Sequence, residues 1–386
     1  MKVAFFSNSY FPYLSGITIS IGILREELEL LGHTAFVVAP GYPGHVETDR
    51  RILRLPSAPA PYPGYRLVLP YSYKIFDSLR KEKIDIIHAH QPFEVGLAGL
   101  ALARRLKIPF VYTFHTLFTR YSHHVPLLPE KFTKGALVAY LTWFCNQTDT
   151  VIVPSEMVRR LLVRRKVKKP IQVLPTGLRL EEIEQQAKLK TQRAEIRSLH
   201  GLPKDAKLLL YTGRVSQEKN IPFLLDVFPK IATQESNTWL IVVGGGPKEK
   251  EYRQLAETRH KKIIFTGQKQ YREVVDYCLA ADVFVYASTT ETQGLVLNEA
   301  KACGLPVVAV FGGGIADVVE NGIDGYLLPQ NPDIFVRHVV QLLRNDSQRR
   351  SMGSRAQKDS RNRFSSSVIA KRMESVYNSL IQRGLT

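Results

Sequence analysis

The sequence has few cysteines and no long apolar run. Only three of its 386 residues are cysteine, Cys145, Cys278 and Cys303, and their spacing fits neither a metal site nor a disulfide framework, which favours a reducing compartment. The most apolar internal stretch, residues 136–145, is far shorter than the roughly 18 residues of a membrane-spanning helix. The first residues have the pattern of a short strand and not of a signal peptide. We therefore expect a cytoplasmic protein, either soluble or peripheral on the inner face of the cell membrane.

The sequence also has far fewer acidic than basic residues. The chain has 35 Asp and Glu against 53 Lys and Arg, a net charge of +18 at pH 7. Cations cluster at residues 159–169 and 349–372. Such an excess indicates a phosphorylated substrate, an anionic bilayer or nucleic acid as a partner, or else a solvated cationic surface. No nucleic acid is expected, because the sequence has no helix-turn-helix, zinc-finger or RNP-like motif.

Short β-rich runs alternate with helical segments along the whole chain. The predicted strands are residues 3–6, 35–38, 84–88, 110–113, 150–153 and 172–174, then, after a break, 208–211, 240–243, 263–266, 283–286 and 307–310. Continuous apolar strands alternating with helices indicate parallel sheets covered on both faces. Two such series predict an α/β protein with two doubly wound, Rossmann-like units. Residues 56–70 hold five prolines and read as an irregular surface loop.

The most informative segment is residues 291–299, Glu-Thr-Gln-Gly-Leu-Val-Leu-Asn-Glu. Its two carboxylates, Glu291 and Glu299, bracket Gly294, after which a helix is predicted to begin. Because a strand is predicted just upstream, the segment runs from strand through a turn to a helix N-terminus, which is a site for anions. The carboxylates can bind the neutral hydroxyl groups of the molecule that carries the anion. Phosphate joined to a polyol indicates a nucleotide sugar.

Two cations follow the first predicted strand of the second series. Gly213 permits a tight exit from that strand, Arg214 offers a fixed fork of donors, and Lys219 offers a flexible point charge. Together they suit a diphosphate whose negative charge increases as a glycosidic bond breaks.

Four residues after strands of the first series are further candidates. His115 follows a strand, at the edge where doubly wound sheets bind ligands. His88 and His90 end another strand and are either structural or part of a ligand site. Gly16, after the first strand, would let the backbone approach a phosphate closely.

The spacing Glu-x7-Glu, followed by Ala302-Cys-Gly-Leu-Pro-Val-Val308, resembles the retaining GT-B glycosyltransferases of family 4 (glycosyl transferases group 1). Diacylglycerol glucosyltransferases and envelope-polysaccharide glycosyltransferases are members of this family. The resemblance implies two domains facing a cleft, with acceptor binding at residues 1–176, nucleotide-sugar binding at 177–365, and a C-terminal helix at 366–386 that packs back onto the first domain. It also implies retaining transfer of a hexose, with glucose from UDP-glucose as the first expectation.

The same resemblance implies roles for single residues. His115 and Glu291 would lie beside the transferred sugar, while Arg214 and Lys219 would stabilise the departing diphosphate. The residues implied in donor binding are Gly16, Arg214, Lys219, Gly267, Lys269, Glu291, Gly294, Leu295, Val296 and Glu299. Cationic side chains and a helix dipole can replace a metal in stabilising the leaving group, so neither a metal nor another cofactor is expected.

The acceptor is expected at the first domain. The candidate residues on this side are His88, His90, Tyr121, His123 and His124. Residues 119–145 mix cations with large apolar groups, which suits either a segment resting on an anionic membrane surface or an ordinary amphipathic core helix.

Several functions stay open from the sequence. The acceptor is a membrane lipid such as diacylglycerol, or else a growing or lipid-linked cell-envelope polysaccharide, in which case UDP-sugar and GDP-mannose are both candidate donors. Alternatives from other classes are a nucleic-acid-binding α/β protein and a nucleotide-sugar epimerase or phosphorylase of similar fold.

Overall fold

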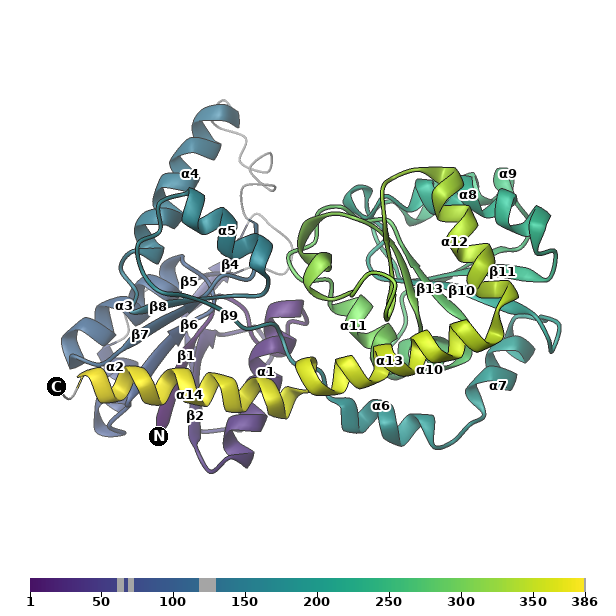
Figure 1. Ribbon diagram of the computed structural model, residues 1–386. Coiled ribbons are helices and arrows are strands. Elements are labelled where there is room, and N and C mark those ends of the chain that lie inside the picture. The colour runs from purple at the N-terminus through teal and green to yellow at the C-terminus, as the bar shows by residue number, and fades with distance from the viewer. Residues whose placement is uncertain (61–65, 69–72, 118–129, 385–386) are drawn as a thin grey trace. The chain divides into compact units, whose positions relative to one another are not determined.

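The computed structural model describes residues 1–60, 66–68, 73–117 and 130–384 (Figure 1). The chain divides into two compact units. Unit 1 comprises residues 1–177 together with 366–386, and unit 2 comprises residues 178–365. The final helix therefore belongs to the same unit as the first strand, although all of unit 2 separates them in sequence.

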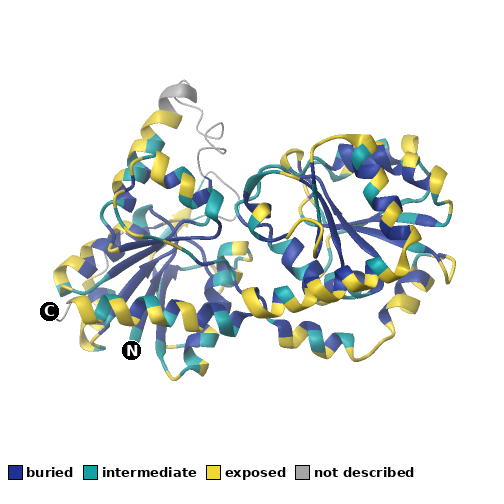
Figure 2. Ribbon diagram, viewed as in Figure 1, coloured by how far each residue is buried: buried dark blue, intermediate teal, exposed yellow. Residues whose placement is uncertain are grey.

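Unit 1 is built on a seven-stranded sheet of order β3-β2-β1-β6-β7-β8-β9. All its strand pairs are parallel. Its strands are β1 (Lys2–Phe6), β2 (Thr34–Pro40), β3 (Ile52–Leu55), β6 (Ile86–Ala89), β7 (Phe110–Thr113), β8 (Thr150–Val153) and β9 (Ile171–Val173). The central strands are buried along nearly their whole length (Figure 2), as parallel sheets covered on both faces require.

Helices cover both faces of this sheet. They are α1 (Gly16–Leu30), α2 (Tyr73–Lys81), α3 (Glu94–Leu106), α4 (Glu130–Cys145), α5 (Glu156–Arg164) and α14 (Ser366–Gly384). On one face of the sheet, the helices α2, α3, α4 and α5 form one apolar cluster with the strands. On the other face, α1 and α14 form a second cluster with them. The apolar positions of α14, including Ile369, Met373 and Tyr377, are buried there. The terminal helix is thus part of the core of unit 1.

Two parts of unit 1 differ from the sequence expectation. The segment 56–70, expected to be irregular, contains the antiparallel pair β4 (Ser57–Pro59) and β5 (Arg66–Val68). Prolines are tolerated there because this pair lies outside the main sheet. The strand β3 was not expected, because Ile52-Leu-Arg-Leu55 is only four residues long.

Unit 2 holds a six-stranded parallel sheet of order β12-β11-β10-β13-β14-β15. Its strands are β10 (Lys207–Thr212), β11 (Thr238–Val243), β12 (Ile263–Gly267), β13 (Val283–Tyr286), β14 (Val307–Val310) and β15 (Gly325–Leu328). Its helices are α6 (Leu180–Ala187), α7 (Gln192–Leu199), α8 (Ile221–Gln234), α9 (Glu249–Arg259), α10 (Tyr271–Ala280), α11 (Leu295–Ala302), α12 (Pro332–Arg344) and α13 (Asp346–Phe364), with 3₁₀ turns η3 (Gln217–Lys219) and η4 (Gly313–Asp317). None of the helices in the described ranges is both long and apolar enough to cross a membrane.

A buried lysine joins α11 to α13 in unit 2. The Lys301 side chain is fully buried, and its Nζ donates to Asp324 at 2.7 Å and to Asp359 at 2.6 Å. Asp324 is itself 2% exposed. Removing one partner of a buried ion pair leaves an uncompensated charge, which costs far more than losing a surface pair. This cluster anchors α11, the helix that carries Glu299.

We predict that Lys301→Met destabilises unit 2 by about 3 to 5 kcal/mol, because two carboxylates lose their buried partner. The thermal midpoint measured by calorimetry should then fall by about 10 °C. The matched control is Lys230→Met, which removes the exposed pair of Lys230 with Asp333 and should cost less than about 1 kcal/mol. Equal shifts in the two variants would show that the buried cluster does not stabilise the unit.

Candidate functional site

Strand order in unit 2 reverses beside β10. The chain runs outward from β10 through β11 to β12, and then returns to β13 on the other side of β10. Loops that leave β10 and β13 therefore diverge, and ligands of doubly wound sheets bind in the crevice that this leaves at the carboxyl edge. Arg214 and Lys219 follow β10, and Glu291 follows β13.

Glu291 lies at the centre of a polar cluster at this edge. It forms an ion pair with Lys219, and it accepts hydrogen bonds from Tyr286 Oη at 2.7 Å and Ser288 Oγ at 3.0 Å. Burial opposes ionisation, but the Lys219 ammonium and these hydrogen bonds outweigh it and hold the pKa of Glu291 below its usual value. Glu291 is therefore an ionised, oriented acceptor.

The helix α11 begins four residues after Glu291, at Leu295. Its N-cap Gly294 has a φ of +81°, and no side chain caps the helix. The N–H groups of Leu295 and Val296 have no partner within an α-helix, whereas Leu297 N–H donates to the Gly294 carbonyl at 3.0 Å. The loop is held in place by Gly314 N–H, which donates to the Glu291 carbonyl at 2.7 Å. The segment has the strand, turn and helix start that the sequence indicates.

Glu299 is the second carboxylate and lies one turn into α11. Burial raises its pKa to about 7. The two carboxylates of the segment therefore have opposite shifts: Glu291 is held ionised by a lysine, whereas Glu299 gains a proton easily. Pairs of acids whose pKa values are shifted in opposite directions are typical of functional sites.

Three of the implied donor-binding residues make no side-chain contact with this cluster among the described residues. Arg214 is exposed, and its guanidinium has no hydrogen-bond or ion-pair partner in the described part of the chain. Lys269 pairs with Glu273 at 3.0 Å in the first turn of α10. Gly267 ends β12, the edge strand of the sheet. The structure thus brings Lys219, Glu291 and the start of α11 together, and leaves the roles of the other three as predictions.

Unit 1 has a corresponding reversal between β1 and β6. His90 follows β6 and His115 follows β7, and His90 Nδ1 lies 2.9 Å from His115 Nε2. Burial lowers the pKa of His115 to about 4, so its ring is neutral at neutral pH. Both histidines line a small pocket of about 30 Å³ with residues of α1 and α14.

The other candidates of unit 1 have different environments. His88 is fully buried, and both of its ring nitrogens are hydrogen-bonded within the unit. Its ring therefore has a structural role and no nitrogen left to bind a ligand. Gly16 is the first residue of α1, and a Cβ there would meet no atom within 4 Å, so packing alone does not require glycine. Tyr121, His123 and His124 lie outside the described residues.

Sequence reasoning missed two groups of polar residues. Tyr286 and Ser288 contact Glu291, and the available signal was their place at and just beyond the end of the predicted strand 283–286. In unit 1, Ser7 Oγ donates to Gln91 Oε1 at 3.0 Å, and Asn8 Nδ2 donates to Glu94 Oε2 at 2.8 Å.

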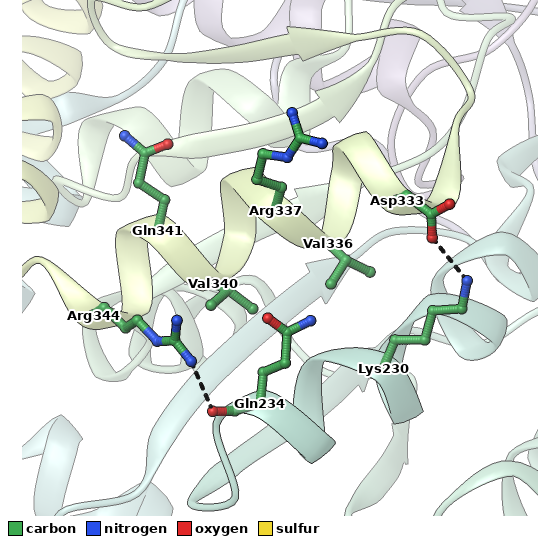
Figure 3. A pocket seen from close by; sticks show the side chains of 8 residues that line it. All are labelled: Lys230, Gln234, Asp333, Val336, Arg337, Val340, Gln341 and Arg344. Atoms are coloured by element: carbon green, nitrogen blue, oxygen red, sulfur yellow. Dashed lines mark hydrogen bonds and ion pairs between the residues drawn. The ribbon is translucent and has the colours of Figure 1, made fainter.

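A separate groove of about 500 Å³ runs between α8 and α12 in unit 2 (Figure 3). Lys230 crosses it to Asp333 at 2.9 Å, and Arg344 crosses it to the Gln234 carbonyl at 3.2 Å. None of the predicted site residues lines this groove. It is a space between two covering helices and not part of the candidate site.

Two doubly wound parallel sheets, one of which carries paired carboxylates around a helix N-terminus, define a glycosyltransferase of the GT-B class. The family model for glycosyl transferases group 1 matches residues 192–359, and that for Glycosyltransferase Family 4 matches residues 14–182. The chain belongs to this glycosyltransferase family.

Individual proteins are similar over most of the chain. The alpha-monoglucosyldiacylglycerol synthase of Acholeplasma laidlawii is 30% identical over 99% of this chain and 98% of its own length. The alpha-monoglucosyldiacylglycerol synthase of Streptococcus pneumoniae is 36% identical over 80% of this chain and 71% of its own length. The solved structure of Anabaena HepE in complex with UDP and glucose has a TM-score of 0.73 at 18% identity, covering 98% of this chain and all of that one. This likeness shows the fold.

We predict that Glu299→Gln stabilises the protein at pH 8 but not at pH 4. The pKa of Glu299 is about 7 in the folded state and about 4.3 in an unfolded chain, so the folded state binds its proton more tightly. The stabilisation that this carboxyl gives at low pH is lost as pH rises from about 4 to about 7. The variant should therefore gain up to about 4 kcal/mol at pH 8, measured by denaturant unfolding at both pH values. A gain that is the same at pH 4 would contradict the raised pKa.

Proposed function

We propose that this enzyme transfers a hexose, with glucose the first expectation, from a UDP-sugar to a membrane lipid such as diacylglycerol, with retention of anomeric configuration. The observation that carries the proposal is the arrangement at the carboxyl edge of unit 2. There an ionised Glu291, paired with Lys219, precedes the uncapped start of α11, and Glu299 follows one turn later. The two relatives named as alpha-monoglucosyldiacylglycerol synthases support a lipid acceptor and glucose.

Each part of this arrangement suits one part of a nucleotide sugar. The N–H groups at the start of α11 and the helix dipole favour the diphosphate. Ionised Glu291 can accept hydrogen bonds from hydroxyl groups of the hexose, and Glu299 can accept them from the ribose. Lys219 and Arg214 would stabilise the negative charge that develops on the departing UDP, without a metal.

Retention requires that the new bond forms on the face from which UDP leaves. We propose that a phosphate oxygen of the donor takes the proton of the acceptor hydroxyl. His115 would lie beside the transferred sugar, and because its ring is neutral it can hydrogen-bond a sugar hydroxyl without placing a positive charge there.

The test supplies UDP-glucose to the purified protein with vesicles that contain diacylglycerol, in EDTA. We expect a lipid-linked α-glucoside, identified by NMR of the product. Arg214→Ala should lower turnover by about 10²- to 10³-fold, because the negative charge on the departing UDP loses a hydrogen-bond donor. Glu299→Ala should mainly weaken the binding of UDP, measured by calorimetry. Arg337→Ala, an exposed arginine of α12, is the matched control.

Three other results would contradict parts of the proposed function. Turnover that survives Arg214→Ala would remove this residue from the leaving-group role. Preference for GDP-mannose, or glycosylation of a polysaccharide primer in place of the lipid, would indicate that the enzyme functions in envelope-polysaccharide assembly. Interconversion of the free nucleotide sugar without any acceptor would indicate an epimerase.

We further propose that unit 1 binds an anionic membrane surface peripherally, through the end of α4 and the loop after α5. Trp143 is 46% exposed on the last turn of α4. Asn146, just beyond that helix, donates to the carbonyl of Lys166 and accepts from the N–H of Lys168, so the backbone of two exposed lysines is fixed at the end of the helix that carries Trp143. An exposed indole near exposed cations suits the headgroup region of a membrane.

We predict that the double variant Lys166→Glu, Lys168→Glu weakens binding to vesicles containing phosphatidylglycerol by about 30-fold or more, since each lysine near such a surface contributes about 1 kcal/mol. Co-sedimentation at low and high salt measures this. The control, Lys204→Glu with Lys261→Glu, makes the same change of net charge at exposed lysines of unit 2. Equal loss in both double variants would mean that net charge, and not this face, governs attachment.

A further inference from the structure

Three histidine rings stack at the carboxyl edge of the unit 1 sheet. His88 and His90 are two residues apart at the end of β6, so their side chains lie on the same face of the sheet. Their ring centroids are 4.3 Å apart at an interplanar angle of 28°. The His90 and His115 rings follow at 5.2 Å and 21°. The stack connects the core of unit 1 to the pocket that His115 lines.

The hydrogen bonds of His88 fix the inner end of the stack. Tyr377, on α14, is fully buried, and the hydrogen bond of its hydroxyl group is to His88 Nδ1 at 2.6 Å. A buried O–H that does not donate is costly, so Tyr377 donates to Nδ1. The proton of His88 is then on Nε2 and is donated to Thr113 Oγ1 at 2.6 Å. His88 is therefore neutral and oriented at both nitrogens.

The surroundings of His90 select its tautomer. Its side chain is 2% exposed, and its Nε2 is buried without a hydrogen-bond partner among the described residues. A proton on Nε2 would be a buried donor without an acceptor, which costs about 1 to 3 kcal/mol and is rarer in proteins than an unpaired acceptor. A proton on Nδ1 has an acceptor 2.9 Å away, Nε2 of His115.

We propose that His90 is a positioning residue that sets the tautomer of His115 by donating its Nδ1–H to His115 Nε2. His115 then carries its own proton on Nδ1 and offers a ligand a hydrogen-bond donor and no basic nitrogen. Resting on the proposed function, this assigns His115 to the binding of a sugar oxygen and excludes it as the base that takes the acceptor proton. The α14 helix contributes through Tyr377, which holds the ring on which His90 stacks.

The direct test is nitrogen NMR of the full chain labelled with ¹⁵N-histidine. Two-bond ¹H–¹⁵N correlations show which nitrogen of each neutral ring is protonated, and the spectrum of His115→Phe identifies the His115 signals among the ten histidines. We expect His115 to be protonated on Nδ1 and His90 also on Nδ1. A His115 ring protonated on Nε2 would overturn the proposal.

Two substitutions at His90 provide a second readout. Asparagine places an amide N–H near the position of Nδ1, whereas glutamine places it near Nε2. We expect His90→Asn to keep turnover within about threefold and His90→Gln to lower it by about 10- to 100-fold, as loss of an orienting partner does elsewhere. Affinity for UDP, measured by calorimetry, should stay unchanged in both variants. If the glutamine variant matches the asparagine variant in turnover, the tautomer role is wrong.

Failure of the proposed function would give a different result. The nitrogen spectra need no substrate, so they decide the tautomers even if diacylglycerol is not glycosylated. Absence of lipid glucoside with the unsubstituted protein would contradict the proposed acceptor, whatever the protonation of His115.

Discussion

Each parallel sheet reverses its strand order beside its first strand, and the candidate residues lie in loops at the carboxyl edge of the strands near that reversal. In unit 2 the reversal separates the loops after β10 and β13, which carry Lys219 and Glu291. In unit 1 the reversal falls between β1 and β6, and the loops after the adjacent parallel strands β6 and β7 lie at the same edge, where His90 meets His115. Because backbone topology fixes these positions, residues far apart in sequence meet without a special arrangement of side chains.

Electrostatics then makes the two carboxylates of one short segment different. Glu291 faces a lysine and two hydroxyl groups, so it stays ionised despite burial. Glu299, four residues into α11, has burial as the only resolved influence on its pKa. Lys219 forms an ion pair with Glu291. Under the proposed function, hydroxyl groups of the donor would hydrogen-bond to the same carboxylate while its diphosphate would compete for the lysine, so binding would exchange the partners of both side chains.

Much of the fold could be predicted from the sequence, because buried parallel strands are continuous apolar runs. The strands at 110–113, 150–153, 283–286 and 307–310 were predicted with their observed bounds. The edge strand β15 was missed because its run, Gly325-Tyr-Leu-Leu328, is short and begins with glycine. Contacts of single side chains could not be predicted in the same way, since partners such as Tyr377 and His88 are set by tertiary packing across the whole chain.

The position of α14 also constrains how the protein can fold. Unit 2 is one continuous segment, so it has all its strands and helices once residue 365 has been made. Unit 1 does not, because one face of its sheet is covered jointly by α1 and α14, and its apolar cluster includes Ile369, Met373 and Tyr377. That face stays exposed until the last residues of the chain are available, although domains generally fold in order of synthesis. The hydrogen bond between Tyr377 and His88 can therefore form only after all of unit 2 has been synthesised.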